Sequence, residues 1–392
     1  MKRLLVFFVV VTMALSACGS SDKKAGSDAG PIKLYQISEL QSPATSLPFM
    51  KTSAEAAVKE INASGGIKGR RLELASCNER NDPNAAVKCA QTATQDKDYV
   101  ALVGGLSLFG DQINPIIEAA KLANVGVSLV SDSDARSPMS FATSAGVPGF
   151  AAMPAVAKKY LNASRIGVMN ISTPAVGTLN SYFEAGAKTS DVKIVKKIEV
   201  PADATDFTQY VSQLDDAGAQ VVVSSMTPQA NLALWQAISS SKSALKTVMS
   251  DATVSADLIK QAGNKITEGN YVCVGTPSSN ATNPTGKAYS ESMAQYAPDE
   301  KVITGVGLNA WLAVKLFAQV AQDIKGPITR ASVLGAMNKV ENMKFYWLES
   351  LSFDQAGPLK DYPRIVNPIT FTNEIVNGQY VERPAFNPFV KR

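Results

Sequence analysis

The sequence contains no histidine among its 392 residues, and this absence excludes several kinds of chemistry. Without imidazole there is no Ser–His or Cys–His nucleophilic pair, no histidine general base and no metal site that depends on histidine ligands. No side chain of the chain has an ordinary pKa near physiological pH. The absence does not exclude catalysis by carboxylates, lysine or a cofactor, but it makes an enzymatic function less expected.

Long apolar runs are also missing, apart from one short run near the N-terminus. Leu4–Leu15 (LLVFFVVVTMAL) follows two basic residues and precedes small ones, which is typical of a secretory signal peptide over residues 1–17. Its twelve residues are fewer than the roughly 20 that a membrane-spanning helix needs. The following LSAC resembles the bacterial lipoprotein signal, which implies a lipid on Cys18. Residues 18–30 are then predicted to be a flexible tether, because they contain no large apolar side chain.

A strong excess of charge of one sign is missing as well. The chain carries a formal net charge of +4, and Lys2 and Arg3 of the signal peptide account for two of these charges. No run of basic residues occurs in the remainder. Binding of nucleic acid by a cationic face is therefore not expected.

Cysteine is scarce, and one of the four is already assigned to the lipid. Cys77 ends a predicted strand and Cys89 lies in the helix predicted to follow. A disulfide between them would close a loop of about a dozen residues and stabilise the fold by roughly 3 kcal/mol, although two separate thiols remain the alternative. Cys273 is predicted to be a buried free thiol. No C-x-x-C is present, which excludes a thioredoxin-like or cysteine-rich zinc site, and no metal is expected.

Short β-branched runs alternate with amphipathic stretches of ten to eighteen residues along the chain. This pattern is typical of βαβ units. Two series of strands are predicted, at residues 32–37, 71–76, 100–103 and 125–130, then at 165–169, 192–200, 220–224, 245–249 and 270–274. Two series imply two parallel sheets, each covered by helices. Strand-like sequence returns after residue 347.

A glycine-rich segment, Ile61–Leu74, reads INASGGIKGRRLEL. Gly65 and Gly66 are predicted to end a helix through a left-handed turn, and Gly69 to open the next strand. The segment is similar to the hallmark I-N-A-x-G-G-I-x-G-(R/K)-x-(I/L)-x-L of the leucine/isoleucine/valine-binding family of type 1 periplasmic binding proteins. The resemblance continues in VGG followed by Ser107 and in LSFD near residue 351, so it spans about residues 31–392.

The resemblance implies an α/β fold of two Rossmann-like lobes, whose parallel sheets are flanked by helices and joined by three hinge crossings. Lobe one is expected at residues 31–146 and 277–346, and lobe two at 147–276 and 347–392. Ligand is expected in the cleft between them, at the carboxyl ends of the strands. The tryptophans Trp235, Trp311 and Trp347 are predicted to be packing residues, with Trp347 near the third crossing.

In lobe one, the resemblance implies that a hydroxyl near Ser107 holds a ligand carboxylate. The placement is ambiguous by one or two positions, so Leu108 or Phe109 could face the cleft, and a helix cap is the alternative role for Ser107. Ser46, ahead of the first helix, is also expected to line the cleft.

A second pair of lining hydroxyls, Ser131 and Ser133, is predicted in the segment SDSDAR (residues 131–136). The segment departs from the more neutral stretch of the family. Asp132 and Asp134 could instead cap the following turn, which is a common role for aspartate.

In lobe two, the candidate ligand-binding residues are Ala175, Thr227 and Asp251. The family usually places an aromatic residue near position 175 and this chain has none there, which weakens the inference of a free aliphatic amino acid. Asp251 matches the position where the family pairs the α-ammonium of its ligand, a contact of about 1.5–3 kcal/mol. The alternative is a cap for a helix beginning near Ser255.

Together these features predict an extracytoplasmic solute-binding lipoprotein of an ABC importer, anchored by lipid at the outer face of a bacterial cell membrane. Its two lobes would close on an amino acid or a related small polar or carboxylated solute and present it to the permease. The alternative is a receptor subunit that signals to a membrane kinase or chemoreceptor. The chain has no P-loop, no G-x-G-x-x-G and no G-x-S-x-G, so neither an enzyme nor a cofactor is expected. A monomer is expected.

Overall fold

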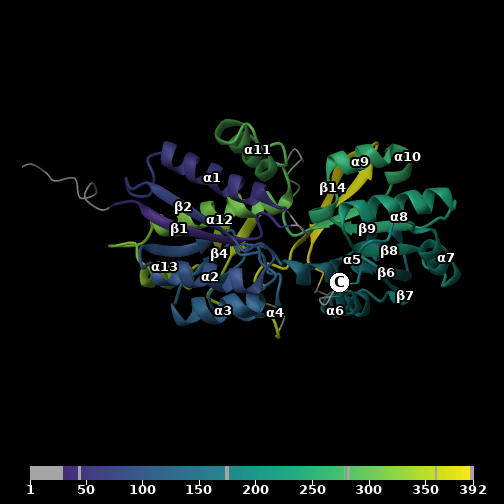
Figure 1. Cartoon of the computed structure of the whole chain (residues 1–392), viewed down its shortest axis with the longest axis horizontal. Coiled ribbons are helices and arrows are strands. Elements are labelled where there is room, and N and C mark those ends of the chain that lie inside the picture. Colours follow the sequence, from purple (N-terminus) through teal and green to yellow (C-terminus); the bar gives the residue numbers. More distant parts are fainter. Residues whose placement is uncertain are drawn as a thin grey trace, which may run out of the picture.

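The computed structural model describes residues 30–42, 46–172, 176–277, 279, 283–357 and 360–388, which form two α/β lobes side by side (Figure 1). The predicted signal peptide, Cys18 and residues 18–29 of the tether lie outside the described residues. Within the described ranges, no helix combines the length and the apolar character that a membrane crossing requires.

The first lobe is built on a five-stranded parallel sheet in the order β2-β1-β3-β4-β5. Its strands are β1 (Ile32–Ser38), β2 (Leu72–Asn78), β3 (Tyr99–Val103), β4 (Asn124–Val125) and β5 (Ser140–Phe141). Its helices are α1 (Pro48–Ala63), α2 (Pro83–Gln95), α3 (Gly110–Ala119), α4 (Asp132–Arg136), α11 (Pro284–Tyr296), α12 (Gly305–Gln322) and α13 (Arg330–Met337). A small hairpin, β11 (Met343–Phe345) and β12 (Leu348–Leu351), packs beside them.

The second lobe is built on a seven-stranded sheet in the order β14-β13-β10-β9-β8-β6-β7. Its strands are β6 (Arg165–Ile171), β7 (Lys193–Val200), β8 (Val221–Ser225), β9 (Lys246–Ser250), β10 (Tyr271–Val274), β13 (Thr370–Val376) and β14 (Gln379–Phe386). The helical segments are η1 (Val147–Ala151), α5 (Ala152–Leu161), α6 (Val176–Thr189), α7 (Thr208–Asp216), α8 (Pro228–Ser240), η2 (Asp251–Thr253), α9 (Ala256–Ala262) and α10 (Asn264–Thr267). Strands β6 to β10 run parallel, and β13 and β14 complete the sheet as an antiparallel pair.

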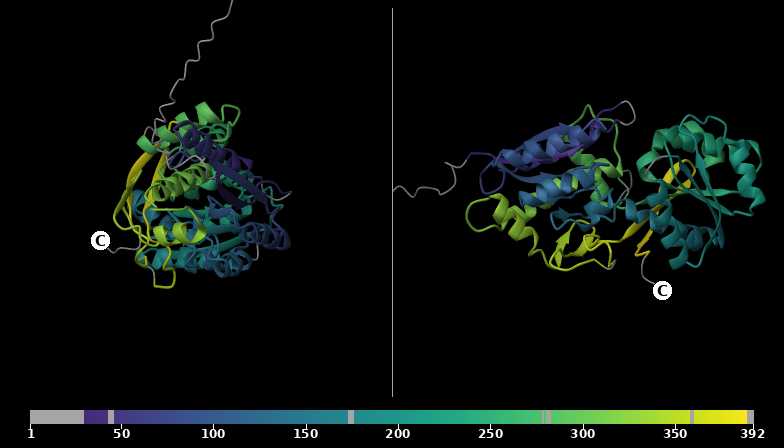
Figure 2. Two further views of the ribbon diagram at one scale, coloured as in Figure 1. Left: turned by 90° about the vertical axis from the view of Figure 1, so that its left-hand side faces the viewer. Right: turned by 60° about the horizontal axis from the view of Figure 1, so that its bottom comes forward.

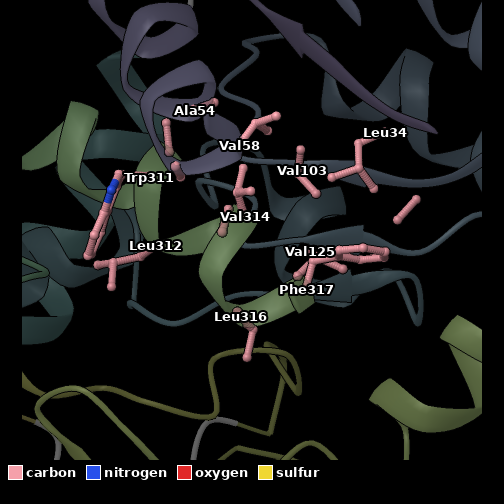
Figure 3. Close-up of a cluster of buried hydrophobic side chains, with 14 of the residues drawn as sticks. Leu34, Ala54, Val58, Val103, Val125, Trp311, Leu312, Val314, Leu316 and Phe317 are labelled. Carbon is pink, nitrogen blue, oxygen red and sulfur yellow. The ribbon is translucent and has the colours of Figure 1, made fainter. Parts of the chain in front are cut away.

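The core of the first lobe is organised around α12. Other elements of the lobe pack around this helix, so its side chains are apolar on almost every side. Figure 3 shows its side chains among residues of α1 and of the strands β1, β3 and β4. Gly126, directly after β4, has φ +64°, and a Cβ there would lie 2.2 Å from the Cβ of Ala313. Only glycine allows this close approach, which fixes α12 against the carboxyl ends of the strands.

The hallmark turn and the disulfide are confirmed. Gly65 (φ 96°) and Gly66 (φ 72°) leave α1 in left-handed conformations, as the sequence predicts. A Cβ on Gly66 would lie 2.0 Å from the carbonyl oxygen of Arg70, so the turn requires glycine. Cys77 and Cys89 are bonded, with their Cα atoms 5.8 Å apart, and Cys273 is a buried free thiol.

Two strands of the first sheet differ from the prediction. The strand expected at 125–130 is only the two residues Asn124–Val125, because Gly126 turns the chain out of the sheet. The strand β5 was not predicted, since two residues carry no readable pattern.

The chain passes between the lobes after β5, after β10 and before β13, and Figure 2 shows the last of these segments in yellow. Leu348, Leu351 and Phe353 are buried in the core of the first lobe. The third crossing therefore lies beyond Phe353, later than the predicted boundary between 346 and 347. Trp347 packs against the cores of both lobes.

Candidate functional site

A cavity lies between the two sheets, at the carboxyl ends of β3 and β4 in the first lobe and of β9 and β10 in the second. It contains about 760 Å³ of empty space, part of it open to solvent. The first crossing, from Ser144 to Phe150, and the amino end of α12 close its remaining sides.

The cavity wall is largely apolar, with a few polar groups. Its apolar side chains are Leu106, Leu129, Val130, Phe150 and Val306, and its hydroxyl groups come from Ser128, Ser144, Ser250, Thr276 and Thr370. Among the described lining residues, Asp251 is the one charged side chain. The wall thus suits a solute with an apolar body, and it offers a single carboxylate to a cationic group.

Asp251 follows β9 directly and begins η2. A Cβ on Gly305, the first residue of α12, would lie 2.2 Å from Oδ2 of Asp251 and 3.3 Å from Oγ1 of Thr276. A carboxylate of the second lobe, a hydroxyl and the amino end of an 18-residue helix of the first lobe therefore meet at one corner of the cavity. The helix dipole favours a negative charge at that end. Ser255 itself caps α9 by accepting from the N–H of Leu258 at 3.2 Å, so the alternative role considered for Asp251 is already filled.

Phe150 and Cys273 add an aromatic ring and a thiol to the wall. Phe150 stacks on Phe183 with ring centroids 6.2 Å apart, which holds the ring in place. Burial, and then the nearby charge of Asp251, raises the pKa of the Cys273 thiol, so the group stays protonated at neutral pH. Among the described lining residues, Phe150 is the one aromatic side chain.

A family of periplasmic binding proteins matches residues 32–355 of the chain. The chain belongs to this family. A comparison with curated proteins found no match.

Solved structures of binding proteins share the fold. An extracellular ligand-binding receptor from Verminephrobacter eiseniae superposes with a TM-score of 0.76 at 18% identity, over 90% of this chain and 100% of that one. A leucine-, isoleucine-, valine-, threonine- and alanine-binding protein from Brucella ovis, in a closed conformation, has a TM-score of 0.74 at 16% identity, over 93% and 97%. A fatty acid ABC transporter substrate-binding protein from Thermomonospora curvata has a TM-score of 0.73 at 16% identity, over 91% and 92%.

Of the eight predicted ligand-binding residues of this periplasmic binding protein, Asp251 lies on the cavity wall. Ser107 is not among the described residues of this wall. Its Oγ accepts from the N–H of Phe109 at 2.9 Å, and the residue lines a second, smaller pocket. Phe109 precedes α3 and packs against the core around Ile113.

Ser131 and Ser133 have structural partners in the first lobe. Ser131 caps α4 by accepting from the N–H of Asp134 at 3.1 Å, and the carboxylate of Asp134 accepts from the N–H of Ser131 in return. Ser133 accepts from the side-chain amide of Asn114 at 3.0 Å. The wall itself is formed by Ser128–Val130, just ahead of this cap.

The remaining three residues lie elsewhere or are not described. Ser46 is exposed ahead of α1, and it is not among the residues that line the cavity. Thr227 is exposed and caps α8, accepting from the N–H of Ala230 at 3.2 Å. Ala175 lies outside the described residues.

A buried carboxylate lies beside the loop that carries Ser107. Glu79 follows β2 directly and is fully buried. Burial raises the pKa of Glu79 to about 7; the hydroxyl of Ser107 lowers it, whereas the nearby charge of Glu39 raises it further. The side chain is therefore partly protonated at neutral pH.

Sequence reasoning missed the contribution of α12 to the wall. Asn309 of that helix donates to the carbonyl oxygen of Gly126 at 3.0 Å and to Oγ of Ser128 at 3.2 Å, so it joins the helix to the loop after β4. The small residues at 305–307 (GVG) were the available signal, because a helix that starts without bulky side chains leaves room for a neighbour.

Proposed function

We propose that this protein is a solute-binding lipoprotein of an ABC importer, held by Cys18 at the outer face of the cell membrane, and that it captures an amino acid or a related small solute between its lobes. The observation that carries the proposal is the cavity between the two sheets, with Asp251 as its one charged lining residue among those described. The family to which the chain belongs supports a binding role without chemistry.

The chemistry of the wall supports a ligand that carries an ammonium group. The carboxylate of Asp251 pairs with that group, and hydroxyl groups such as those of Ser128 and Thr276 bind its polar atoms. Leu106 and Leu129 form an apolar part of the wall, which contacts the apolar part of the solute. A solute bound between two lobes stabilises the closed arrangement only by its higher affinity for it.

Isothermal titration with a panel of amino acids, amides and aromatic acids tests this function. We expect heat of binding from at least one amino acid. Asp251→Asn should weaken that binding by roughly 10- to 100-fold, because a charge-assisted hydrogen bond contributes about 1.5–3 kcal/mol. The same substitution should leave unchanged the binding of a solute that lacks an amine.

The matched control is Asp257→Asn, an exposed aspartate in the first turn of α9 in the same lobe. This variant should bind as the unmodified protein does. Equal losses in the two variants, or no heat from any solute class, would contradict the proposal.

A further inference from the structure

A cluster of four side chains connects the two lobes outside the cavity. Tyr182 of α6, in the second lobe, donates its hydroxyl to Oδ1 of Asp132 of α4, in the first lobe, at 2.8 Å. Oδ2 of the same carboxylate pairs with Nη2 of Arg136 at 3.4 Å. The guanidinium of Arg136 lies 5.3 Å from the ring centroid of Tyr362, in the third crossing. We call Tyr182, Asp132, Arg136 and Tyr362 the clasp.

The clasp is a packed unit. The rings of Tyr182 and Tyr362 lie with their centroids 6.2 Å apart, and Nε of Arg136 donates to the carbonyl oxygen of Asp361 at 3.1 Å. Tyr182 is only 5% exposed although it lies where the lobes meet. Burial, and then the hydrogen bond to Asp132, raises the pKa of Tyr182, so its hydroxyl keeps the proton that it donates.

The clasp also explains the charged residues of the segment 131–136, which the cavity wall does not use. Residues 131–136 carry two aspartates and an arginine where the sequence was expected to be more neutral. Asp134 is used within the first lobe, since its carboxylate accepts from the N–H groups of Val130 and Ser131. Asp132 and Arg136 have no such role in the cap and instead reach the second lobe and the third crossing.

We propose that the clasp holds the two lobes together in the absence of solute, and that it thereby sets the affinity of the cavity from outside it. Separation of the lobes at this point would break a hydrogen bond to a carboxylate and expose the ring of Tyr182 to water. Hydrogen bonds to charged groups are among the stronger ones in proteins. A smaller fraction of molecules in the binding-competent arrangement gives a lower apparent affinity for solute. This consequence of the clasp rests on the proposed function.

The lobe equilibrium can be measured without any ligand. Spin labels on Gln112→Cys in α3, which packs beside α4, and on Lys188→Cys in α6 occupy exposed helical positions in opposite lobes of the full chain, on the side of the clasp (Figure 1). Other cysteines of the described residues are bonded or buried. Pulsed electron paramagnetic resonance then gives the distribution of distances between the labels.

Tyr182→Phe removes only the hydroxyl, and we expect it to lower the ratio of short to long distances by roughly tenfold. Asp132→Ala should have a similar effect. The double variant should shift the ratio no further than either single variant, because both remove the same contact. Tyr160→Phe is the control, since the Tyr160 hydroxyl donates to the carbonyl oxygen of Pro384 within the second lobe, and this variant should match the parent.

Three results would overturn the clasp: parental distances in Tyr182→Phe, an equal shift in Tyr160→Phe, or additive shifts in the double variant. These outcomes are independent of the solute. A chain whose distances shift as expected but which binds no solute keeps the clasp and loses the proposed function. A chain that binds solute while Tyr182→Phe changes no distance keeps the function and loses the clasp.

Discussion

At the scale of single residues, Glu79 makes stability depend on pH in a chain without histidine. Burial raises its pKa from an ordinary 4.5 to about 7 in the folded protein. Between these two values the folded state binds more protons than the unfolded state, so the free energy of unfolding falls as pH rises through this window. The shift corresponds to a loss of about 3 kcal/mol. Glu79→Gln cannot ionise, and urea unfolding at pH 5 and pH 8 should show it as stable as the parent at pH 5 and more stable at pH 8.

An exposed glutamate on β2, the strand that precedes Glu79, is the control for this prediction. Glu73→Gln in β2 should leave the difference between pH 5 and pH 8 as it is in the parent. If Glu79→Gln loses as much stability between the two pH values as the parent does, the carboxylate of Glu79 is not the group responsible.

At the scale of elements, the contact between the loop after β4 and α12 depends on a missing side chain. Gly126→Ala introduces a Cβ 2.2 Å from that of Ala313, at a φ of +64° that L-residues rarely adopt. Left-handed strain and overpacking together should cost about 2–4 kcal/mol of unfolding free energy. Urea unfolding measures the loss.

Gly335→Ala in α13 is the control, because no atom lies within 4 Å of its added Cβ. It should be neutral or slightly stabilising, and a similar loss in both variants would contradict the packing argument.

The same elements indicate what the sequence could and could not predict. The strand expected at 165–169 is observed at Arg165–Ile171, because its apolar run is a pattern of neighbouring residues alone. The left-handed turn at Gly65 and Gly66 was predictable for the same reason. The role of Ser131 was not, since a serine before a short helix can either cap it or bind a ligand, and only the position of Asp134 decides between the two. Contacts between lobes, such as Gly305 with Asp251, join residues that no local pattern relates.

At the scale of the whole molecule, one tryptophan is placed to respond to movement between the lobes. Trp347 packs against both cores, with its ring 6.0 Å from that of Phe371 in β13. Its indole N–H is buried and donates no hydrogen bond to any residue that the structure describes. Trp235 and Trp311 instead each lie within one lobe and donate to Thr247 and to Ser292. Any rearrangement of the lobes therefore changes the surroundings of Trp347 first.

Closure on a solute should accordingly change the fluorescence of Trp347 and leave that of the other two tryptophans almost unaltered. Once calorimetry has identified a solute, its titration should give an emission change in the parent protein. Trp347→Phe should abolish the change while the heat of binding remains, because the residue lies outside the cavity wall. Trp235→Phe is the matched control and should keep the signal. A signal that disappears with Trp235 would place the movement inside the second lobe, whereas one that disappears with Trp347 places it between two lobes that move as units.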